Sequence, residues 1–293
     1  MRCILVILNY NDAERSLNLA MKCKNYQSID KIIIVNNGST DNSLIFLKMN
    51  LLNEQNIILL NSEKNGGFAY GNNIAAKYIS KNFSSKYVLF SNTDTIYSDE
   101  SVEQCLRYLE NIDDLALISM RIKNPNDIEE ISCWNKRKYL DFFLANFYLY
   151  RTYINSPLNP TKIENTDFQF VEHVRGSFML FKIDALVDIG FFDENTFLYF
   201  EEEIIAERLR KKDYKIGIVT NHFYIHDHLQ SNSSNKLNTY FYESLCYYLN
   251  TYCNVGKVRI YFLKLAIWYK DFEIRFIIFN FKKIKNMIKN FLS

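Results

Sequence analysis

YVLFSNTDTIYSDES, residues 87–101, is a short apolar run that ends in a polar turn carrying one aspartate. The apolar residues 87–90 are followed by the polar segment 91–95, and a helix start is expected at 98–100. A brief apolar run bounded by turn residues is typical of a strand buried inside a sheet. Asp94 is therefore expected at the carboxyl end of a core strand.

Strand and helix signals alternate on both sides of this stretch. Predicted strands cover residues 3–8, 31–36, 56–61, 86–92, 115–119 and 214–219. Predicted helices cover residues 12–24, a segment with an N-cap at Ser39 or Thr40, a segment opened by the glycine-rich turn 65–73, residues 101–110 and a segment opened by 201–203. Residues 123–166 lack a clear pattern and are expected to form a long excursion over the sheet. The alternation predicts an α/β fold with a Rossmann-like, mostly parallel sheet, helices on both faces, and ligands beyond the strands' carboxyl ends.

Composition narrows the class of protein. Net charge is +2 over 293 residues, which argues against a nucleic-acid partner. None of the six cysteines forms a C-x-x-C pair, which favours a reducing cytoplasm over a disulfide scaffold. The apolar start is too short for a signal peptide, and no apolar stretch approaches the roughly 20 residues that cross a bilayer. We therefore expect a cytoplasmic protein.

The C-terminal segment is basic. Residues 256–293 contain nine Lys or Arg and two acidic residues, a net charge of +7, which leaves −5 for the rest of the chain. Basic and large apolar side chains alternate there at roughly helical spacing, so residues 232–293 are predicted as a helical, basic amphipathic extension. Such a helix either lies in a membrane interface or packs on the rest of the protein with a solvated basic face.

Four short patterns carry candidate chemistry, and each has a structural alternative. Asp94, two residues after Asn92, is suited to a divalent cation, but Asn-Thr-Asp is also good turn chemistry. His226 and His228 share one face of a strand and are either metal ligands or a surface pair. The acids 201–203 either supply a general base or are ordinary helix-start acids, and turn 65–73 either binds phosphate or is only a tight turn.

The order of these patterns is more specific than any one of them. A strand ending in NYN, then VNNGSTD, NGGFAYGNN, SNTDT, GSFMLFK, GFFDENTFLYFEEE and a late histidine together resemble the family 2 glycosyltransferases, most strongly the rhamnosyltransferase-like bacterial branch. The resemblance spans about residues 2–231. It implies a GT-A catalytic domain at 1–231, with a nucleotide-sugar half at about 1–122 and an acceptor half at about 123–231, followed by the extension 232–293.

The resemblance also implies a donor side and a metal. Asp94 matches the last aspartate of the D-x-D motif, which binds Mn²⁺ or Mg²⁺, and Asn92 stands in the place of its first aspartate. Asn36 occupies the position of an aspartate that meets a uracil ring, and His226 or His228 matches a late metal-contacting histidine. The implied nucleotide-sugar side comprises Asn9, Asn11, Asn36, Gly67, Asn72, Asn73, Asn92 and Asp94.

On the acceptor side, Glu202 matches the expected general base and Glu201 precedes it. Ile204 replaces a frequent aspartate, and Arg175 and Gly176 lie where the acceptor-side wall begins. The implied reaction is inverting, metal-dependent transfer of a sugar from a UDP- or dTDP-linked donor to a hydroxyl of a saccharide or lipid-linked saccharide. The implied setting is synthesis of bacterial surface polysaccharide such as capsule or O-antigen, in the cytoplasm or peripherally on the inner membrane's cytoplasmic face.

Three alternatives remain open from the sequence. Asn36, Asn92 and Ile204 depart from the family pattern and are compatible with a catalytically inactive sugar-nucleotide-binding protein of the same fold. A nucleotidyltransferase would need a basic glycine-rich loop near the first strand, and the segment found there, LNYNDAERSLN, is not such a loop. A dehydrogenase would need G-x-G-x-x-G after that strand.

Overall fold

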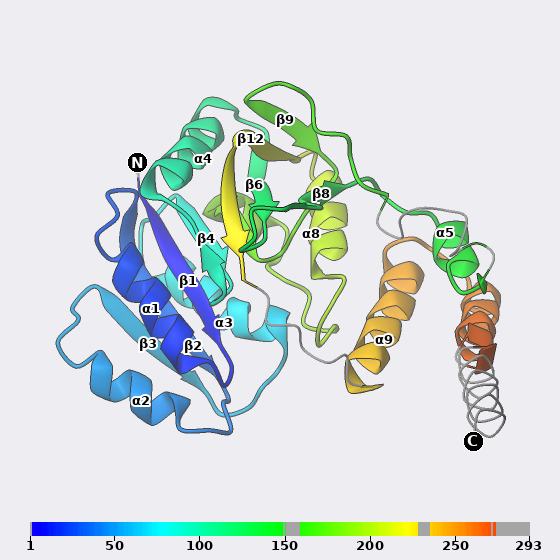
Figure 1. Ribbon diagram of the computed structural model, residues 1–293, viewed down its shortest axis with the longest axis horizontal. Coiled ribbons are helices and arrows are strands. Elements are labelled where there is room, and N and C mark those ends of the chain that lie inside the picture. The colour runs from blue at the N-terminus through cyan, green and yellow to red at the C-terminus, as the bar shows by residue number, and fades with distance from the viewer. Residues whose placement is uncertain (1, 149, 151–158, 228–234, 271, 274–293) are drawn as a thin grey trace, which may run out of the picture. The chain divides into compact units, whose positions relative to one another are not determined.

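The computed structural model describes residues 2–148, 150, 159–227, 235–270 and 272–273 (Figure 1). The chain divides into two compact units, one of residues 1–136 and 160–248 and one of residues 137–159 and 249–293. Residues 137–159 thus group with the C-terminal segment although they are distant from it in sequence. The domain boundary at residue 231 stays a prediction.

Strands and helices alternate through most of the first unit, as the sequence predicts. The strands are β1 (Cys3–Asn9), β2 (Ile29–Asn37), β3 (Ile57–Ser62), β4 (Tyr87–Ser91), β5 (Thr95–Ile96), β6 (Leu115–Lys123), β7 (Glu129–Glu130), β8 (Cys133–Trp134), β9 (Phe168–Val171), β10 (His173–Val174), β11 (Phe178–Lys182) and β12 (Lys215–His226). The helices are α1 (Ala13–Cys23), α2 (Ser43–Asn50), α3 (Phe68–Asn82), α4 (Asp99–Asn111), α5 (Tyr139–Leu144), α7 (Ile183–Asp188), α8 (Glu201–Arg210) and α9 (Asn235–Thr251).

The main sheet is mostly parallel, which confirms the predicted fold class. Its order is β3-β2-β1-β4-β11-β6-β12-β5, and β7 and β9 pair with β6 and β12. Strands β1 to β4 are parallel to one another, and β6 is parallel to β12. Strand β11 lies antiparallel between β4 and β6, so the strands on its two sides share one direction. Their carboxyl ends therefore meet at one edge of the sheet.

Both faces of the sheet are buried. On β1, Cys3, Leu5 and Ile7 face one core, whereas Ile4 and Val6 face the other. Helices α1, α2 and α4 contribute apolar residues to the first core, and α3, α7 and α8 contribute to the second. This two-sided burial explains the continuous apolar runs of the strands, because no face of a covered parallel strand meets water.

The predicted helix N-cap at Ser39 or Thr40 is wrong, since α2 begins at Ser43. Both residues are instead used at the strand ends. The Ser39 hydroxyl donates to Asn36 Oδ1 at 2.6 Å, and the Thr40 N–H donates to Asn11 Oδ1 at 2.8 Å. The cap chemistry that the sequence offers is thus taken up by a tertiary polar cluster.

The second unit contains α5 and a C-terminal helix, residues 257–273 with residue 271 outside the described part. Leu263, Ala266 and Ile267 of this helix are buried. The Tyr139 hydroxyl of α5 donates to the Arg259 carbonyl at 2.8 Å. Within the described residues, no helix combines the length and apolar character needed to traverse a bilayer. Residues 274–293 of the predicted extension lie outside the described residues.

Candidate active site

A row of asparagines closes the ends of three neighbouring strands. Asn9, Asn36 and Asn61 are in register on β1, β2 and β3. Asn9 Nδ2 donates to Asn36 Oδ1 at 2.9 Å, and Asn36 Nδ2 donates to Asn61 Oδ1 at 2.8 Å. Asn9 and Asn36 are almost fully buried. Both polar groups of the Asn36 side chain are engaged within the protein, so we assign Asn36 to fastening the sheet edge.

The next residue, Asn37, has a different environment. Its Nδ2 donates to Gly67 O at 3.0 Å and to Asn65 Oδ1 at 3.2 Å. Its Oδ1 is buried and has no hydrogen-bond partner within the described part of the chain. Asn37 borders a cavity of about 340 Å³ lined by Leu8, Tyr10, Asn37, Asn65, Gly67, Phe68, Phe197, Leu198, Leu237 and Tyr240. Asn37 is not among the residues predicted from the sequence, although its place directly after the predicted strand 31–36 is a signal for it.

Gly67 closes the glycine-rich turn against a distant loop. Its φ is +93°, and a Cβ built there would stand 2.1 Å from the Phe197 carbonyl oxygen. The Phe68 N–H at the start of α3 donates to that same oxygen at 3.0 Å. Only glycine tolerates this combination of backbone angle and close approach. The structure therefore places Gly67 at the wall of the cavity and ties the turn to the segment before α8.

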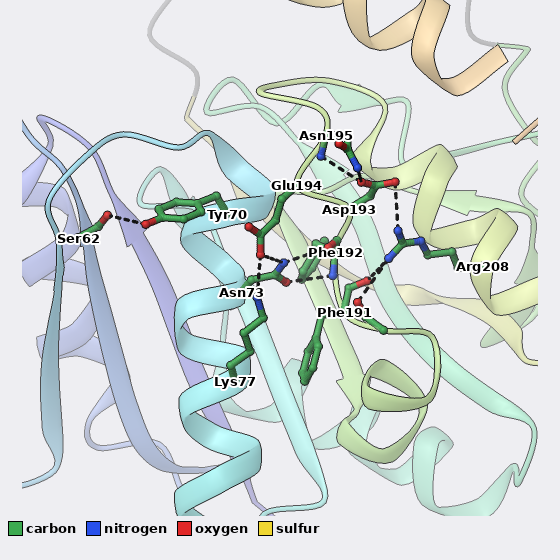
Figure 2. A network of polar contacts seen from close by, with 11 residues as sticks. Ser62, Tyr70, Asn73, Lys77, Phe191, Phe192, Asp193, Glu194, Asn195 and Arg208 are labelled. Atoms are coloured by element: carbon green, nitrogen blue, oxygen red, sulfur yellow. Dashed lines mark hydrogen bonds and ion pairs between the residues drawn. The ribbon is translucent and has the colours of Figure 1, made fainter. Parts of the chain in front are cut away.

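Asn72 and Asn73 lie on α3, where their side chains make packing contacts. Asn72 Nδ2 donates to the Phe68 carbonyl one turn earlier. Asn73 accepts the Phe192 N–H at 3.0 Å and donates to the Phe192 carbonyl at 2.9 Å and to Glu194 Oε1 at 2.7 Å (Figure 2). The Asn73 amide thus binds the loop that contains Phe192 and Glu194. We therefore leave Asn73 out of the proposed donor site.

The same loop is held from its other side by α8. Arg208 pairs with the buried Asp193 at 3.1 Å and donates to the Phe191 carbonyl at 2.8 Å (Figure 2). Tyr247 of α9 also donates to Asp193, at 2.8 Å. Lys77 of α3 pairs with Glu194 at 2.8 Å. These contacts fix residues 191–194 between α3 and α8, upstream of the predicted catalytic acids.

The chain then enters α8 through a strained turn. Tyr199 and Phe200 both have positive φ, at +72° and +67°, a conformation that bulky side chains rarely adopt. Phe200 is buried against Phe241 and Tyr248, with ring centroids 5.2 and 5.6 Å away. Strain of this kind persists where packing enforces it, and it is common at functional sites. Here it sets the direction of the helix start that carries Glu201 and Glu202.

Glu202 is the acid with the most distinctive surroundings. Its Oε1 accepts the backbone N–H of Gly176 at 3.1 Å. Burial, followed by the charge of Glu203, raises the pKa of Glu202 to about 7, although the Arg175 guanidinium acts in the opposite direction. Burial and the neighbouring Glu202 charge raise the pKa of Glu201 well above its usual range. The two acids thus share a low-dielectric helix start in which Glu202 titrates near neutrality.

Gly176 connects Glu202 to the Asp94 turn. Phe178 at the start of β11 pairs with Ser91 at the end of β4. Beyond that pair, the Asn92 N–H donates to the Ser177 carbonyl at 3.0 Å. A short stretch of hydrogen-bonded backbone therefore joins the predicted base to the predicted metal-binding turn. The insertion of β11 between β4 and β6 makes this connection.

Asp94 and His226 meet at the same edge of the sheet. Residue 226 pairs with Thr95 across the β12–β5 ladder, and His226 Nε2 lies 3.2 Å from Asp94 Oδ1. The His226 side chain is 3% exposed and that of Asp94 16%. His228 lies outside the described residues.

The donor set of this pair fits a divalent cation. Carboxylate oxygen and imidazole nitrogen both bind Mn²⁺-type ions. Two atoms bound at about 2.1 Å to one ion at right angles lie about 3 Å apart, close to the spacing of Asp94 and His226. Among the described residues, no group of three or more His, Cys, Asp or Glu is placed to hold a metal. A cation at this pair would therefore require further oxygens from elsewhere, such as those of a donor diphosphate.

Asn11 and Arg175 complete the predicted set. Asn11, with φ of +55°, is exposed and donates to Thr40 Oγ1 at 3.0 Å. Arg175 Nη2 donates to the Ile131 carbonyl at 3.1 Å, and its guanidinium lies 5.9 Å from the Trp134 ring centroid. Both residues are anchored by the protein itself, and their contacts with substrates stay predictions.

The fold and site define an α/β protein with a mostly parallel sheet, in which an acidic helix start is hydrogen-bonded to the turn before β11. The chain belongs to glycosyl transferase family 2, whose sequence profile matches residues 4–190. This confirms the resemblance read from the ordered motifs.

Two curated relatives are similar in sequence. The low-salt glycan biosynthesis hexosyltransferase Agl10 of Haloferax volcanii is 24% identical over 213 residues, 73% of this chain and 63% of that protein. Rhamnosyltransferase WbbL of Escherichia coli K12 is 27% identical over 172 residues, 55% of this chain and 60% of that protein. The matched part thus spans less than two thirds of either relative.

Solved structures of low sequence identity share the fold. Mannosyltransferase PcManGT from Pyrobaculum calidifontis, in complex with GDP-Man and Mn²⁺, aligns with a TM-score of 0.58 at 12% identity, covering 92% of this chain and 73% of that one. GalNAc-T7 with UDP, GalNAc and Mn²⁺ aligns with a TM-score of 0.59 at 11% identity, covering 95% of this chain and 57% of that one. Both support the GT-A fold.

Proposed function

We propose that the protein is an inverting, metal-dependent glycosyltransferase. In this proposal it moves a sugar from a UDP- or dTDP-linked donor to a hydroxyl of a saccharide or lipid-linked saccharide during synthesis of bacterial surface polysaccharide, such as capsule or O-antigen. The observation that carries the proposal is Glu202, a half-buried acid whose pKa is raised to about 7 and which is joined through Gly176 and Ser177 to the turn bearing Asp94.

Glu202 is suited to the role of general base. A base that titrates near the working pH is ionised often enough to act and basic enough to remove a hydroxyl proton. The Gly176 N–H fixes one carboxylate oxygen, Oε1, which leaves Oε2 to accept the proton of the acceptor hydroxyl. One base on the face opposite the leaving group produces inversion, whereas retention would need a second, nucleophilic group. Glu201, whose pKa is also raised, is assigned a supporting role as part of the low-dielectric surroundings of Glu202.

On the donor side, Asp94 and His226 would hold the divalent cation. When bound, the cation offsets the negative charge that develops on the diphosphate as the sugar leaves. Asn92 contributes its backbone N–H to the Ser177 carbonyl and so fixes the turn in which Asp94 stands.

The nucleobase is assigned to the 340 Å³ cavity beside Asn37. The buried Asn37 Oδ1 can accept a hydrogen bond from a ring N–H, and uracil and thymine both carry such a group. Tyr10 and Phe197 line the same cavity and offer aromatic surface to a base. Both polar groups of the Asn36 side chain already make hydrogen bonds within the protein. The proposed contact with the base therefore moves from Asn36 to Asn37.

The proposed place of action is the cytoplasm, at the cytoplasmic face of the inner membrane, where a lipid-linked acceptor would lie. Segment 256–293, with its net charge of +7, is the proposed contact with that surface. Arg175 and Gly176 are the proposed acceptor-side residues of the catalytic unit.

A thermal-shift panel of UDP, dTDP and GDP with and without Mn²⁺ tests the donor side. We expect stabilisation by UDP or dTDP that requires Mn²⁺ and disappears in Asp94→Ala. Transfer or hydrolysis of a labelled sugar nucleotide then tests catalysis. Metal-dependent nucleotide binding without either reaction would indicate the inactive sugar-nucleotide-binding protein, and binding to none of the nucleotides would contradict the proposal.

A further inference from the structure

The C-terminal helix of the second unit has an exposed apolar face. Six large apolar residues recur at spacings of one, three and four positions, and every one is exposed: Val258, Tyr261, Phe262, Leu265, Trp268 and Phe272. At 3.6 residues per turn they fall within about one third of the helix circumference. Trp268 is 66% exposed and stacks on Phe272 with ring centroids 6.0 Å apart. So much contiguous apolar surface marks a contact site.

The opposite side of this helix is packed within the second unit. Leu263, Ala266 and Ile267 are buried, and the helix is fixed to α5 by the hydrogen bond from Tyr139 to the Arg259 carbonyl. These contacts determine how the helix is rotated within its unit. The exposed apolar face lies on the opposite side of the helix from these buried residues.

Basic side chains border the apolar face along one edge. By helical position, Lys257 and Lys264 lie along one edge of the apolar face. Arg259 and Lys270 lie on the other side of the helix, at the same angles as the buried Ala266 and Leu263. Among the described residues of the helix, the only acid is Glu273. Lys and Arg can lay their alkyl stems on apolar surface while the charged ends reach a neighbouring phosphate layer.

We propose that this face binds an anionic lipid bilayer, with the helix lying parallel to the surface. The apolar side chains enter the headgroup region, where Trp and Tyr are favoured, and Lys257 and Lys264 meet lipid phosphates. The biological use of this contact rests on the proposed function, because a lipid-linked acceptor lies at such a surface. The contact itself does not depend on glycosyl transfer.

A second copy of the chain is the competing occupant. Pairing two such faces would bring the bordering lysines of both copies together, with little acidic partner in the described helix to offset them. Like charges placed opposite each other oppose association. An anionic lipid surface complements both the apolar stripe and its basic edge, which decides for lipid.

Co-sedimentation of the full chain with vesicles tests the inference. We expect binding to vesicles of phosphatidylcholine mixed with phosphatidylglycerol, weaker binding to phosphatidylcholine alone, and loss of the difference at high salt. The stripe variant Val258→Ser/Phe262→Ser/Trp268→Ser is expected to bind at least ~10-fold more weakly, since three large apolar side chains no longer leave water. The charge variant Lys257→Gln/Lys264→Gln is expected to lose the preference for anionic vesicles.

The first unit offers a matched control. Ile45, Met49 and Leu52 are equally exposed apolar residues, on and beside α2, so their triple Ser variant removes similar surface elsewhere. That variant is expected to bind vesicles like the wild type. Circular dichroism melting confirms that each variant is folded.

The wild-type protein supplies a measurement that needs no stripe variant. The chain has two tryptophans, Trp134 with 3% exposure and Trp268 with 66%. Brominated lipids should quench Trp268 fluorescence when anionic vesicles are added. Absence of quenching, or a stripe variant that binds as the wild type does, overturns the inference. A concentration-dependent dimer that the stripe variant abolishes, with no vesicle binding, overturns it in favour of the second copy.

Discussion

Gly176 and Glu202 are in direct contact: the Gly176 N–H donates to Glu202 Oε1 at 3.1 Å, and a Cβ at position 176 would stand 2.9 Å from that oxygen. The residues come from different parts of the fold, one from the turn before β11 and one from the start of α8. The absence of a side chain at 176 lets the acid approach the sheet edge, so this pair sets the position of the proposed base.

Replacement of Gly176 by Ala should displace the Glu202 carboxylate and lower kcat by about 10–100-fold, because a small misplacement of a reacting group is costly. Nucleotide binding should change little, since the donor contacts lie elsewhere. Steady-state kinetics and UDP titration separate the two effects. Gly256→Ala is the control, because a Cβ at 256 meets nothing within 4 Å. Equal kcat in Gly176→Ala and wild type would exclude this positioning role.

Replacement of Glu202 by Gln should lower kcat by about 100-fold or more while Mn²⁺-dependent nucleotide binding persists. In the wild type, kcat/KM should fall as the pH drops through about 7, where Glu202 takes up a proton. A profile flat from pH 5 to 8, or full turnover by the Gln variant, would show that another group is the base.

The same variant should change stability with a defined sign. Glu202 titrates near 4.5 when unfolded and near 7 when folded, so the folded state favours the protonated acid and loses stability as pH rises between these values. Glu202→Gln removes that loss and should raise the free energy of unfolding by about 1–3 kcal/mol at pH 8, with no gain below pH 4. Urea unfolding at both pH values checks this. A destabilised Gln variant at pH 8 would contradict the raised pKa.

His226 should contribute to metal affinity. His226→Ala should lower the affinity for Mn²⁺ in the presence of UDP by about 10–100-fold. Asp94→Ala should abolish Mn²⁺-dependent stabilisation by UDP. His222, on the same strand beside Ser101 Oγ, is the matched control and its Ala variant should behave as the wild type. Titration of Mn²⁺ into the EDTA-treated protein with UDP gives these affinities. Unchanged affinity in His226→Ala would leave His228 as the remaining histidine candidate.

Asn36 and Asn37 should separate stability from binding. Asn36→Ala leaves Asn9 and Asn61 without their buried partner and should cost about 1–3 kcal/mol of unfolding free energy. Asn37→Ala should cost less and instead weaken UDP binding about 10-fold, as one hydrogen bond to the base is lost. Denaturant melts and nucleotide titration on both variants decide. The reverse pattern would return the base contact to Asn36.

The loop before α8 should depend on Asn73. Its buried amide makes three hydrogen bonds to Phe192 and Glu194, so Asn73→Ala should cost about 1–3 kcal/mol and also lower kcat, because this loop leads into the catalytic helix. Lys77→Ala removes only an exposed ion pair to Glu194 and should cost less than about 1 kcal/mol. Thermal melts and kcat of the pair test this. Weaker UDP binding in a fully stable Asn73→Ala would restore Asn73 to the donor site.

The sequence by itself determined the alternation of strands and helices, the placement of Asp94 after β4, the acidic start of α8 and the family. These are local patterns, since the apolar period, turn residues and motif order are written in neighbouring positions. Only the tertiary structure decided that Asn36, and not Asn37, makes the hydrogen bonds along the sheet edge. It also decided that Asn73 binds the loop at Phe192. It likewise decided that β11 runs antiparallel and brings Gly176 to Glu202, and which face of the C-terminal helix is left exposed. The physical reason is that a side chain's partner is set by strand register and by packing between segments distant in sequence, which no local spacing records.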